Sequence, residues 1–129
     1  MQIHEHELIV SKEDLDVRNH VNNVRYVEWV QDMAEAQWVL KSSEDIRQHY
    51  YWVMISHHIQ YKAEAILNDT LLLKTFVIKS QGVKSTRIVE IYNKSTHKLL
   101  TTSETIWCFM SHNTNRPARI PEHINTLFS

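Results

Sequence analysis

The sequence predicts an α+β domain in which an antiparallel sheet of about five strands curls around one long helix. Three observations support this prediction: one long segment with helical spacing of apolar residues, several segments rich in β-branched and aromatic residues, and the order of strand, helix and four further strands. A lone helix among consecutive strands favours an antiparallel sheet packed on that helix. The 129 residues suffice for one domain with a single core.

The first strand is expected from His4 to Ser11 and the helix from Val24 to Leu40. The helix is predicted because apolar residues recur at i, i+3 and i+4, at Val24, Val27, Val30, Ala34 and Trp38. The charged residues form one narrow stripe, namely Arg25, Glu28, Asp32 and Glu35. Since apolar residues occupy most of the remaining circumference, we expect other structure to enclose most of this helix.

A polar connection is expected around Ser42 to Gln48, followed by four long strands. These strands are predicted at Tyr51 to Ala63, Leu71 to Gln81, Ser85 to Tyr92 and Leu99 to Ser111. The only glycine, Gly82, lies where a tight hairpin needs a positive φ, and residues 93–97 offer a second turn. Pro117 and Pro121 predict an extended closing segment.

Composition excludes several classes of protein. The net charge of -1 gives no overall attraction to nucleic acid or to an anionic membrane. The single cysteine, Cys108, excludes an internal disulfide framework and a four-thiolate zinc site. The first ten residues do not resemble a signal peptide, and no apolar run approaches the roughly 20 residues of a membrane span. We therefore expect a soluble, cytoplasmic protein with no nucleic-acid partner and no membrane span.

The segment DLDVRNHVNNVRY, from Asp14 to Tyr26, concentrates polar chemistry at the start of the helix. Several of its residues are ordinary turn or helix-capping types, namely Asp14, Asn19, Asn22 and Asn23. The first turn of a helix also leaves backbone N–H groups free at the positive end of the helix dipole. A ligand oxygen that carries negative charge can bind at such a position.

The longer segment DLDVRNHVNNVRYVEW resembles the signature of hotdog-fold acyl thioesterases. It is similar both to the 4-hydroxybenzoyl-CoA thioesterase-like enzymes and to the acyl-ACP thioesterases. The resemblance includes the pair Asp14 and Asp16, residues 20–23, Tyr26, residues 59–64 and residues 119–121. It implies a single hotdog domain over residues 1–129 that hydrolyses acyl-CoA or acyl-ACP thioesters without a metal or other cofactor. It also implies a homodimer, or a homotetramer, with two sites per dimer.

The resemblance assigns catalytic roles to three residues. Asp16 matches the catalytic carboxylate, acting either as general base on water or as nucleophile. Glu64 matches a second carboxylate, found in the acyl-ACP branch. His20 would orient water or a carboxylate. The neighbouring cysteine of that branch is Ala65 here, which excludes a thiol mechanism at this position, and Cys108 is expected in the core.

Four further residues are candidates for substrate binding. Arg18 replaces an asparagine of the plant enzymes, and it would lower the pKa of Asp16 or meet a ligand phosphate. Asn22 or Asn23 would fix the loop. Tyr26 belongs to the motif, although packing is the more ordinary role for an aromatic residue on a helix.

Other residues point to functions besides thioester hydrolysis. The pairs His4/His6 and His57/His58 suggest a metal, but neither pair has the further ligands of a tetrahedral site. The basic residues Lys84, Arg87, Arg116 and Arg119 would meet carrier phosphates or simply be solvated. Trp29, Met33 and Trp52 suggest an apolar acyl site. A hotdog protein that only binds acyl thioesters is the main alternative, and a hydratase needs a different arrangement of histidine and carboxylate.

Overall fold

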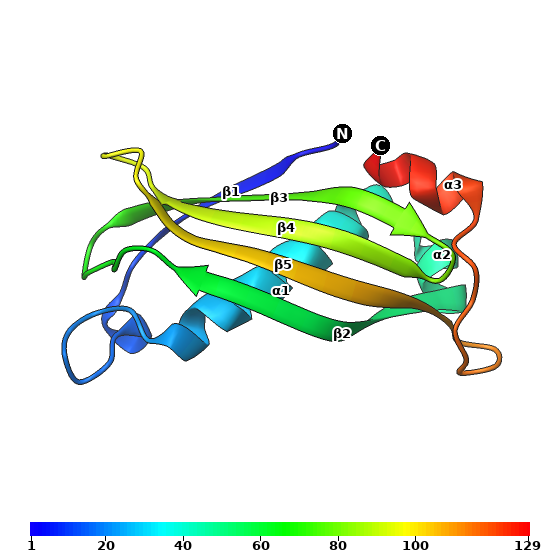
Figure 1. The fold of residues 1–129 in the computed structure, drawn as a ribbon, viewed down its shortest axis with the longest axis horizontal. Coiled ribbons are helices and arrows are strands. Elements are labelled where there is room, and N and C mark those ends of the chain that lie inside the picture. Colours follow the sequence, from blue (N-terminus) through cyan, green and yellow to red (C-terminus); the bar gives the residue numbers. More distant parts are fainter.

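Five strands form one antiparallel sheet in the order β1-β3-β4-β5-β2 (Figure 1). The computed structural model describes residues 1–129. Its strands are β1 (His4–Ile9), β2 (Tyr50–Tyr61), β3 (Thr70–Gln81), β4 (Lys84–Asn93) and β5 (Leu99–Ser111). Its helices are α1 (Asn23–Lys41), α2 (Glu44–His49) and α3 (Glu122–Asn125), with short 3-10 turns η1 (Lys12–Asp14) and η2 (Thr126–Phe128). The α+β class and the five antiparallel strands are as predicted.

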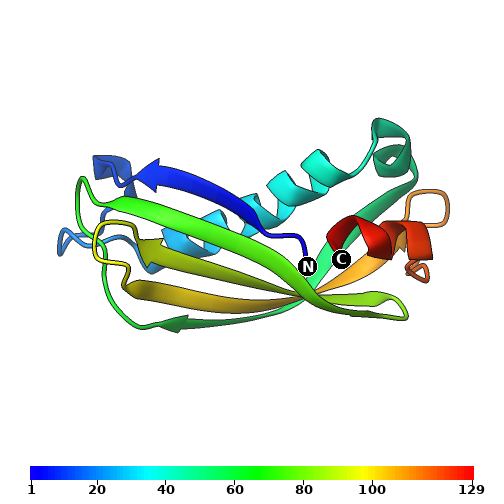
Figure 2. The same cartoon turned by 90° about the horizontal axis from the view of Figure 1, so that it is seen from above.

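Helix α1 lies across one face of the sheet, and the two form separate layers (Figure 2). Its buried residues form one stripe at helical spacing, namely Tyr26, Trp29, Val30, Met33, Ala34 and Gln37. The opposite side is exposed, and Val24 and Leu40 keep 63% and 66% of their surface. The expectation of a largely enclosed helix is therefore not met in the single chain, because the sheet covers only one stripe.

The inner face of the sheet changes character along its length. Near the start of α1 it is apolar, with Leu71, Leu73, Val89 and Ile91 in the core cluster. Burial of each such side chain contributes about 2 kcal/mol to folding. Farther along the same face, Arg87 is only 6% exposed. Of the two roles expected for Arg87, a contact with a carrier phosphate or solvation at the surface, the second is wrong. The two-residue period of β4 places Arg87 on the same face as Val89 and Ile91.

The two expected hairpin turns are confirmed. Gly82 joins β3 to β4 with a φ of +65°, a conformation that glycine adopts without a steric penalty. Between β4 and β5, the side chain of Asn93 accepts hydrogen bonds from the amides of Ser95 and Thr96. His97 completes this turn with a φ of 61°.

Two short helices differ from the predicted connections. Helix α2 lies in the polar connection after α1, and the side chain of Ser43 caps it by accepting a hydrogen bond from the amide of Ile46. Helix α3 and η2 follow Pro121, so the closing segment is extended only up to this proline. The predicted burial of Cys108 is confirmed. Neither α1 nor any other helix combines the length and the hydropathy that a membrane crossing requires.

Candidate active site

Two segments far apart in the sequence pair beside the start of α1. The amide of Val21 donates a hydrogen bond to the carbonyl of Ala65 at 3.0 Å. An isolated β-bridge joins His20 to Ile66, next to this bond. The loop before α1 is thereby fixed against the connection between β2 and β3, and Asp16 and Glu64 come to share one cavity.

This cavity, here called the helix-mouth cavity, has a volume of about 430 Å³. It is lined by Asp16, Arg18, Val21, Asn22, Asn23, Tyr26, Tyr61, Lys62, Ala63 and Glu64. Every predicted site residue except His20 is in this lining, and His20 contacts Glu64. Tyr61 and Lys62 were not singled out from the sequence, although they lie inside the segment 59–64 that carried part of the resemblance.

Backbone amides of the loop that follows Asp16 fix the orientation of its carboxylate. Its Oδ1 accepts hydrogen bonds from the amides of Arg18 at 2.8 Å and His20 at 3.2 Å, while Oδ2 accepts none. Desolvation is the largest single influence on the pKa of Asp16 and raises it. The two amide hydrogen bonds and the positive charge of Arg18 together outweigh desolvation, so this pKa lies below its ordinary value. Asp16 is therefore an oriented carboxylate, ionised at neutral pH, with one oxygen free.

Glu64 differs because both of its oxygens are engaged. Oε1 contacts Nη2 of Arg18 at 2.5 Å, and Oε2 lies 3.3 Å from Nε2 of His20. The side chain of Glu64 is 54% exposed, so these contacts lie at the surface. His20 Nδ1 is buried without a partner, which favours the tautomer that donates from Nε2 to Glu64. Glu64 therefore ties Arg18 and His20 together.

Asp14, the other acid of the pair, faces the interior. It is 4% exposed, and its Oδ1 accepts a hydrogen bond from Nε of Arg25 at 2.7 Å. Its Oδ2 accepts one from the amide of Ser11 at 2.9 Å. The hydrogen bond to Asp14 raises the pKa of Arg25. Asp14 thus fastens the loop to the first turn of α1 and does not line the helix-mouth cavity.

The start of α1 offers fewer free amides than the sequence suggested. Asn22 is the N-cap, and its side chain accepts a hydrogen bond from the amide of Val24 at 3.0 Å. The amide of Arg25 donates to the carbonyl of Asn22 at 2.9 Å. The amide of Asn23, the first helical residue, donates no hydrogen bond, and Asn23 lines the cavity.

Tyr26 belongs mainly to the core. It is 2% exposed, and its ring packs edge-on against those of Trp29 and Tyr61. Its hydroxyl oxygen accepts a hydrogen bond from the amide of Ala65 at 3.3 Å. Burial raises the pKa of Tyr26 to about 12, so the phenol is neutral at physiological pH. The expected packing is confirmed, and a role in substrate binding stays a prediction.

The three residues expected around an acyl group are separated in the fold. Trp29 and Met33 are buried in the core cluster. Trp52 instead lines a second cavity, also of about 430 Å³, near the other end of α1. That cavity contains none of the predicted catalytic residues.

Comparison with known proteins identifies the family. The model of the thioesterase-like superfamily matches residues 10–128. Among curated proteins, none matches the sequence.

Among solved structures, the chain is similar to a 1,4-dihydroxy-2-naphthoyl-CoA thioesterase from Synechocystis. The two share 17% sequence identity and superpose with a TM-score of 0.85, and the match covers 98% of this chain and 96% of that chain. A hypothetical protein from Staphylococcus aureus in complex with CoA gives 19% identity and a TM-score of 0.86, with coverages of 98% and 81%. An aspartate-to-asparagine mutant of 4-hydroxybenzoyl CoA thioesterase, complexed with 4-hydroxybenzoyl CoA, gives 13% identity and a TM-score of 0.88 over the whole of both chains. The shared fold and the family match agree with the resemblance seen in the sequence, and the chain belongs to the thioesterase-like superfamily.

Proposed function

We propose that the protein hydrolyses acyl-CoA thioesters to a free acid and the CoA thiol in the helix-mouth cavity. The observation that carries this proposal is the pairing of an oriented carboxylate, Asp16 with a free Oδ2, with the free amide of Asn23 on the same cavity. Family membership supports thioester hydrolysis. The relatives complexed with CoA or a CoA thioester support CoA as the carrier.

The proposed chemistry assigns different tasks to the two groups. The amide of Asn23 donates to the thioester carbonyl oxygen, where negative charge develops, at the positive end of the helix dipole. Asp16 Oδ2 takes a proton from a water that attacks the carbonyl carbon, or it attacks that carbon itself. In the first route the C–S bond breaks and the leaving thiolate receives the proton that Asp16 took from water. In the second route the C–S bond breaks as an anhydride forms between the acyl group and Asp16. A water then hydrolyses this anhydride, which releases the free acid, regenerates the carboxylate and supplies the proton for the thiolate. Both routes require Asp16 to be ionised.

Glu64 is proposed as a positioning residue. Arg18 and His20 each contact one of its two oxygens. Glu64 therefore lacks an oxygen without a protein contact, whereas Oδ2 of Asp16 has no such contact. Its contacts hold the loop that presents Asp16. Lys62 lines the same cavity and forms no ion pair, so its ammonium group is available to a carrier phosphate.

The experiment that tests the proposal is thiol release from a panel of acyl-CoA and acyl-ACP thioesters, aliphatic and aromatic, with a chelator present. Hydrolysis of CoA thioesters is the expected result. Hydrolysis of acyl-ACP alone would keep the chemistry and change the carrier. Binding of several thioesters without turnover of any would support the non-catalytic alternative.

Replacement of Arg18 by glutamine should shift the pH dependence of hydrolysis. The positive charge of Arg18 lowers the pKa of Asp16, so its removal raises that pKa. A larger fraction of Asp16 is then protonated at a given acidic pH, and the acid limb of kcat/KM moves to higher pH. Rate profiles of wild type and Arg18→Gln measure this shift, and superimposable acid limbs would contradict the assignment of Asp16.

We also propose that the working form is a homodimer joined along β2. Strand β2 is at the edge of the sheet and pairs only with β5, so 12 residues of backbone present one unpaired side (Figure 1). Ile55 on this strand is 48% exposed. A long apolar edge readily pairs with another chain, and a second copy is the occupant that the family resemblance implies.

Replacement of Ile55 by lysine should weaken this dimer, because a charge on an edge strand opposes pairing with another edge. The matched control is Leu40→Lys: Leu40 is 66% exposed but lies on α1, away from any strand edge. Sedimentation of the three proteins should show dissociation at higher concentration for Ile55→Lys only. A monomeric wild type, or equal effects of both variants, would refute a β2 interface.

A further inference from the structure

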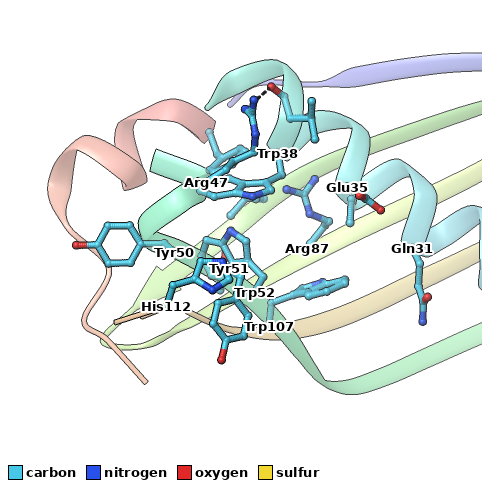
Figure 3. A pocket seen from close by; sticks show the side chains of 15 residues that line it. Gln31, Glu35, Trp38, Arg47, Tyr50, Tyr51, Trp52, Arg87, Trp107 and His112 are labelled. Atoms are coloured by element: carbon cyan, nitrogen blue, oxygen red, sulfur yellow. Dashed lines mark hydrogen bonds between the residues drawn. The ribbon is translucent and has the colours of Figure 1, made fainter. Parts of the chain in front are cut away.

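The second cavity, here called the aromatic cavity, lies at the C-terminal end of α1 (Figure 3). Gln37 marks this end of the buried stripe, and it is 14 residues beyond Asn23, or about 21 Å along the helix axis. Six aromatic side chains line the cavity, namely Trp38, Tyr50, Tyr51, Trp52, Trp107 and Phe128. Its volume of about 430 Å³ is within the range of small-molecule sites.

One buried cation forms part of the cavity wall. Arg87 is 6% exposed, and its Nη1 donates to Gln37 Oε1 at 2.6 Å and to Thr75 Oγ1 at 3.0 Å. Its guanidinium carbon lies 5.5 Å from the ring centre of Phe128. In Figure 3 the Arg87 side chain extends into the space between α1 and the aromatic residues. Both hydrogen bonds use Nη1, so the edge formed by Nε and Nη2 has no partner.

The Nε and Nη2 atoms of this free edge are not fully enclosed by protein. The fully enclosed side-chain nitrogen and oxygen atoms that lack a hydrogen bond are His20 Nδ1 and Thr101 Oγ1, and neither belongs to Arg87. Arg87 therefore presents the two parallel N–H directions that bind a carboxylate in bidentate fashion.

No protein carboxylate neutralises Arg87. Glu35 is the one acidic residue in the lining, but it is exposed and forms no ion pair with Arg87. Desolvation lowers the pKa of Arg87 to about 10, and no carboxylate raises it again. Burial of an unpaired charge costs free energy. An anion that binds in the aromatic cavity would pair with Arg87 and reduce this cost, while the aromatic walls would pack against an apolar body.

We propose that the aromatic cavity binds a small organic carboxylate with an aromatic or short apolar body. The carboxylate pairs with the Nε and Nη2 edge of Arg87, and the body packs among Trp38, Trp52 and Trp107. The site is separate from the helix-mouth cavity and does not depend on the proposed hydrolysis. Two sources share this chemistry: a free acid, or the terminal carboxylate of an acyl group whose other end is a thioester.

The test uses the fluorescence of the protein itself, because three of its four tryptophans line the aromatic cavity. Wild type is titrated at pH 7 with 3-phenylpropanoate and with 3-phenylpropanamide, which has a similar shape and no charge. The acid should bind at least tenfold more tightly, and its affinity should fall with added salt. Equal affinities for acid and amide, or no binding of either, would overturn the proposal whatever any variant does.

Three variants locate the site. Arg87→Met should abolish the preference for the acid and leave the binding of the amide, although loss of the Gln37 and Thr75 hydrogen bonds also destabilises the fold. Ala34→Leu reduces the volume of the cavity from α1 while Arg87 and its partners Gln37 and Thr75 are retained, and it should weaken both probes. Asp16→Asn should leave both affinities unchanged. Loss of acid binding in Asp16→Asn, or its retention in Arg87→Met, would place the carboxylate elsewhere.

The two sources are separated by comparing a dicarboxylic acyl thioester, adipoyl-CoA, with hexanoyl-CoA. If the terminal carboxylate of a substrate occupies the site, adipoyl-CoA is preferred in kcat/KM and Arg87→Met removes this preference. If a free acid occupies it, the two thioesters react alike and 3-phenylpropanoate still binds. The separation of about 21 Å along α1 favours the free acid within one chain.

Discussion

Asp16→Asn is expected to lower kcat for acyl-CoA hydrolysis by on the order of 10³-fold, the scale at which general acid–base groups contribute. The amide cannot accept a proton from water or attack a carbonyl carbon. The side-chain oxygen of asparagine still accepts the amide hydrogen bonds of Arg18 and His20, so the loop keeps its conformation. Steady-state kinetics and thermal unfolding of the same preparations measure both properties.

A KM within about threefold of wild type would show that substrate binding is intact, as expected for an interaction that acts mainly in the transition state. A variant with unchanged kcat would exclude Asp16 as the catalytic carboxylate. A fall in kcat together with a large fall in Tm would instead show that the role of Asp16 is to close the loop.

Asp14→Asn is expected to reduce stability by about 2 kcal/mol, because it removes the charge of a buried carboxylate that is bonded to the partly exposed Arg25. The new amide group also cannot accept hydrogen bonds at both of its ends, so either Ser11 or Arg25 loses a partner. For a chain of 129 residues this loss corresponds to a fall in Tm of about 7 °C. Thermal or urea unfolding measures it.

The matched control is Glu28→Gln, which removes the other acid bonded to Arg25. Glu28 contacts Nη1 of Arg25 at 2.8 Å, but its side chain is 52% exposed. An exposed pair contributes about 0.5 kcal/mol or less. Equal losses for the two variants would mean that the burial of Asp14 does not determine the strength of its contact with Arg25.

The sequence predicted the bounds of the strands better than the short helices in the connections between them. Strand β5 has the predicted bounds, and the other four agree within two residues at each end, because β-branched and aromatic runs end clearly at Gly82 and Asn93. Helix α2 was missed although Ser43 and the acidic residues after it are an N-cap signal, since its six residues are too few for a periodic pattern.

The sequence predicted which residues belong to the candidate site, but it did not predict the separate role of each residue. The motif named Asp14 and Asp16 together, yet only the structure shows that one is buried against Arg25 and the other has a free oxygen at the cavity. Pairing of Val21 with Ala65 depends on tertiary structure and has no local signal. Burial of Arg87 was not among the roles expected from its charge, a phosphate contact or solvation, whereas the alternation along β4 turns its side chain inward.

The most direct test of the account is a comparison of Asp16→Asn and Glu64→Gln in one thiol-release assay, on a thioester that wild type hydrolyses. We expect Asp16→Asn to lose at least tenfold more kcat than Glu64→Gln, because Oδ2 of Asp16 has no protein contact while Arg18 and His20 contact the two oxygens of Glu64. The reverse order would assign the reaction to Glu64 and reduce Asp16 to closure of the loop.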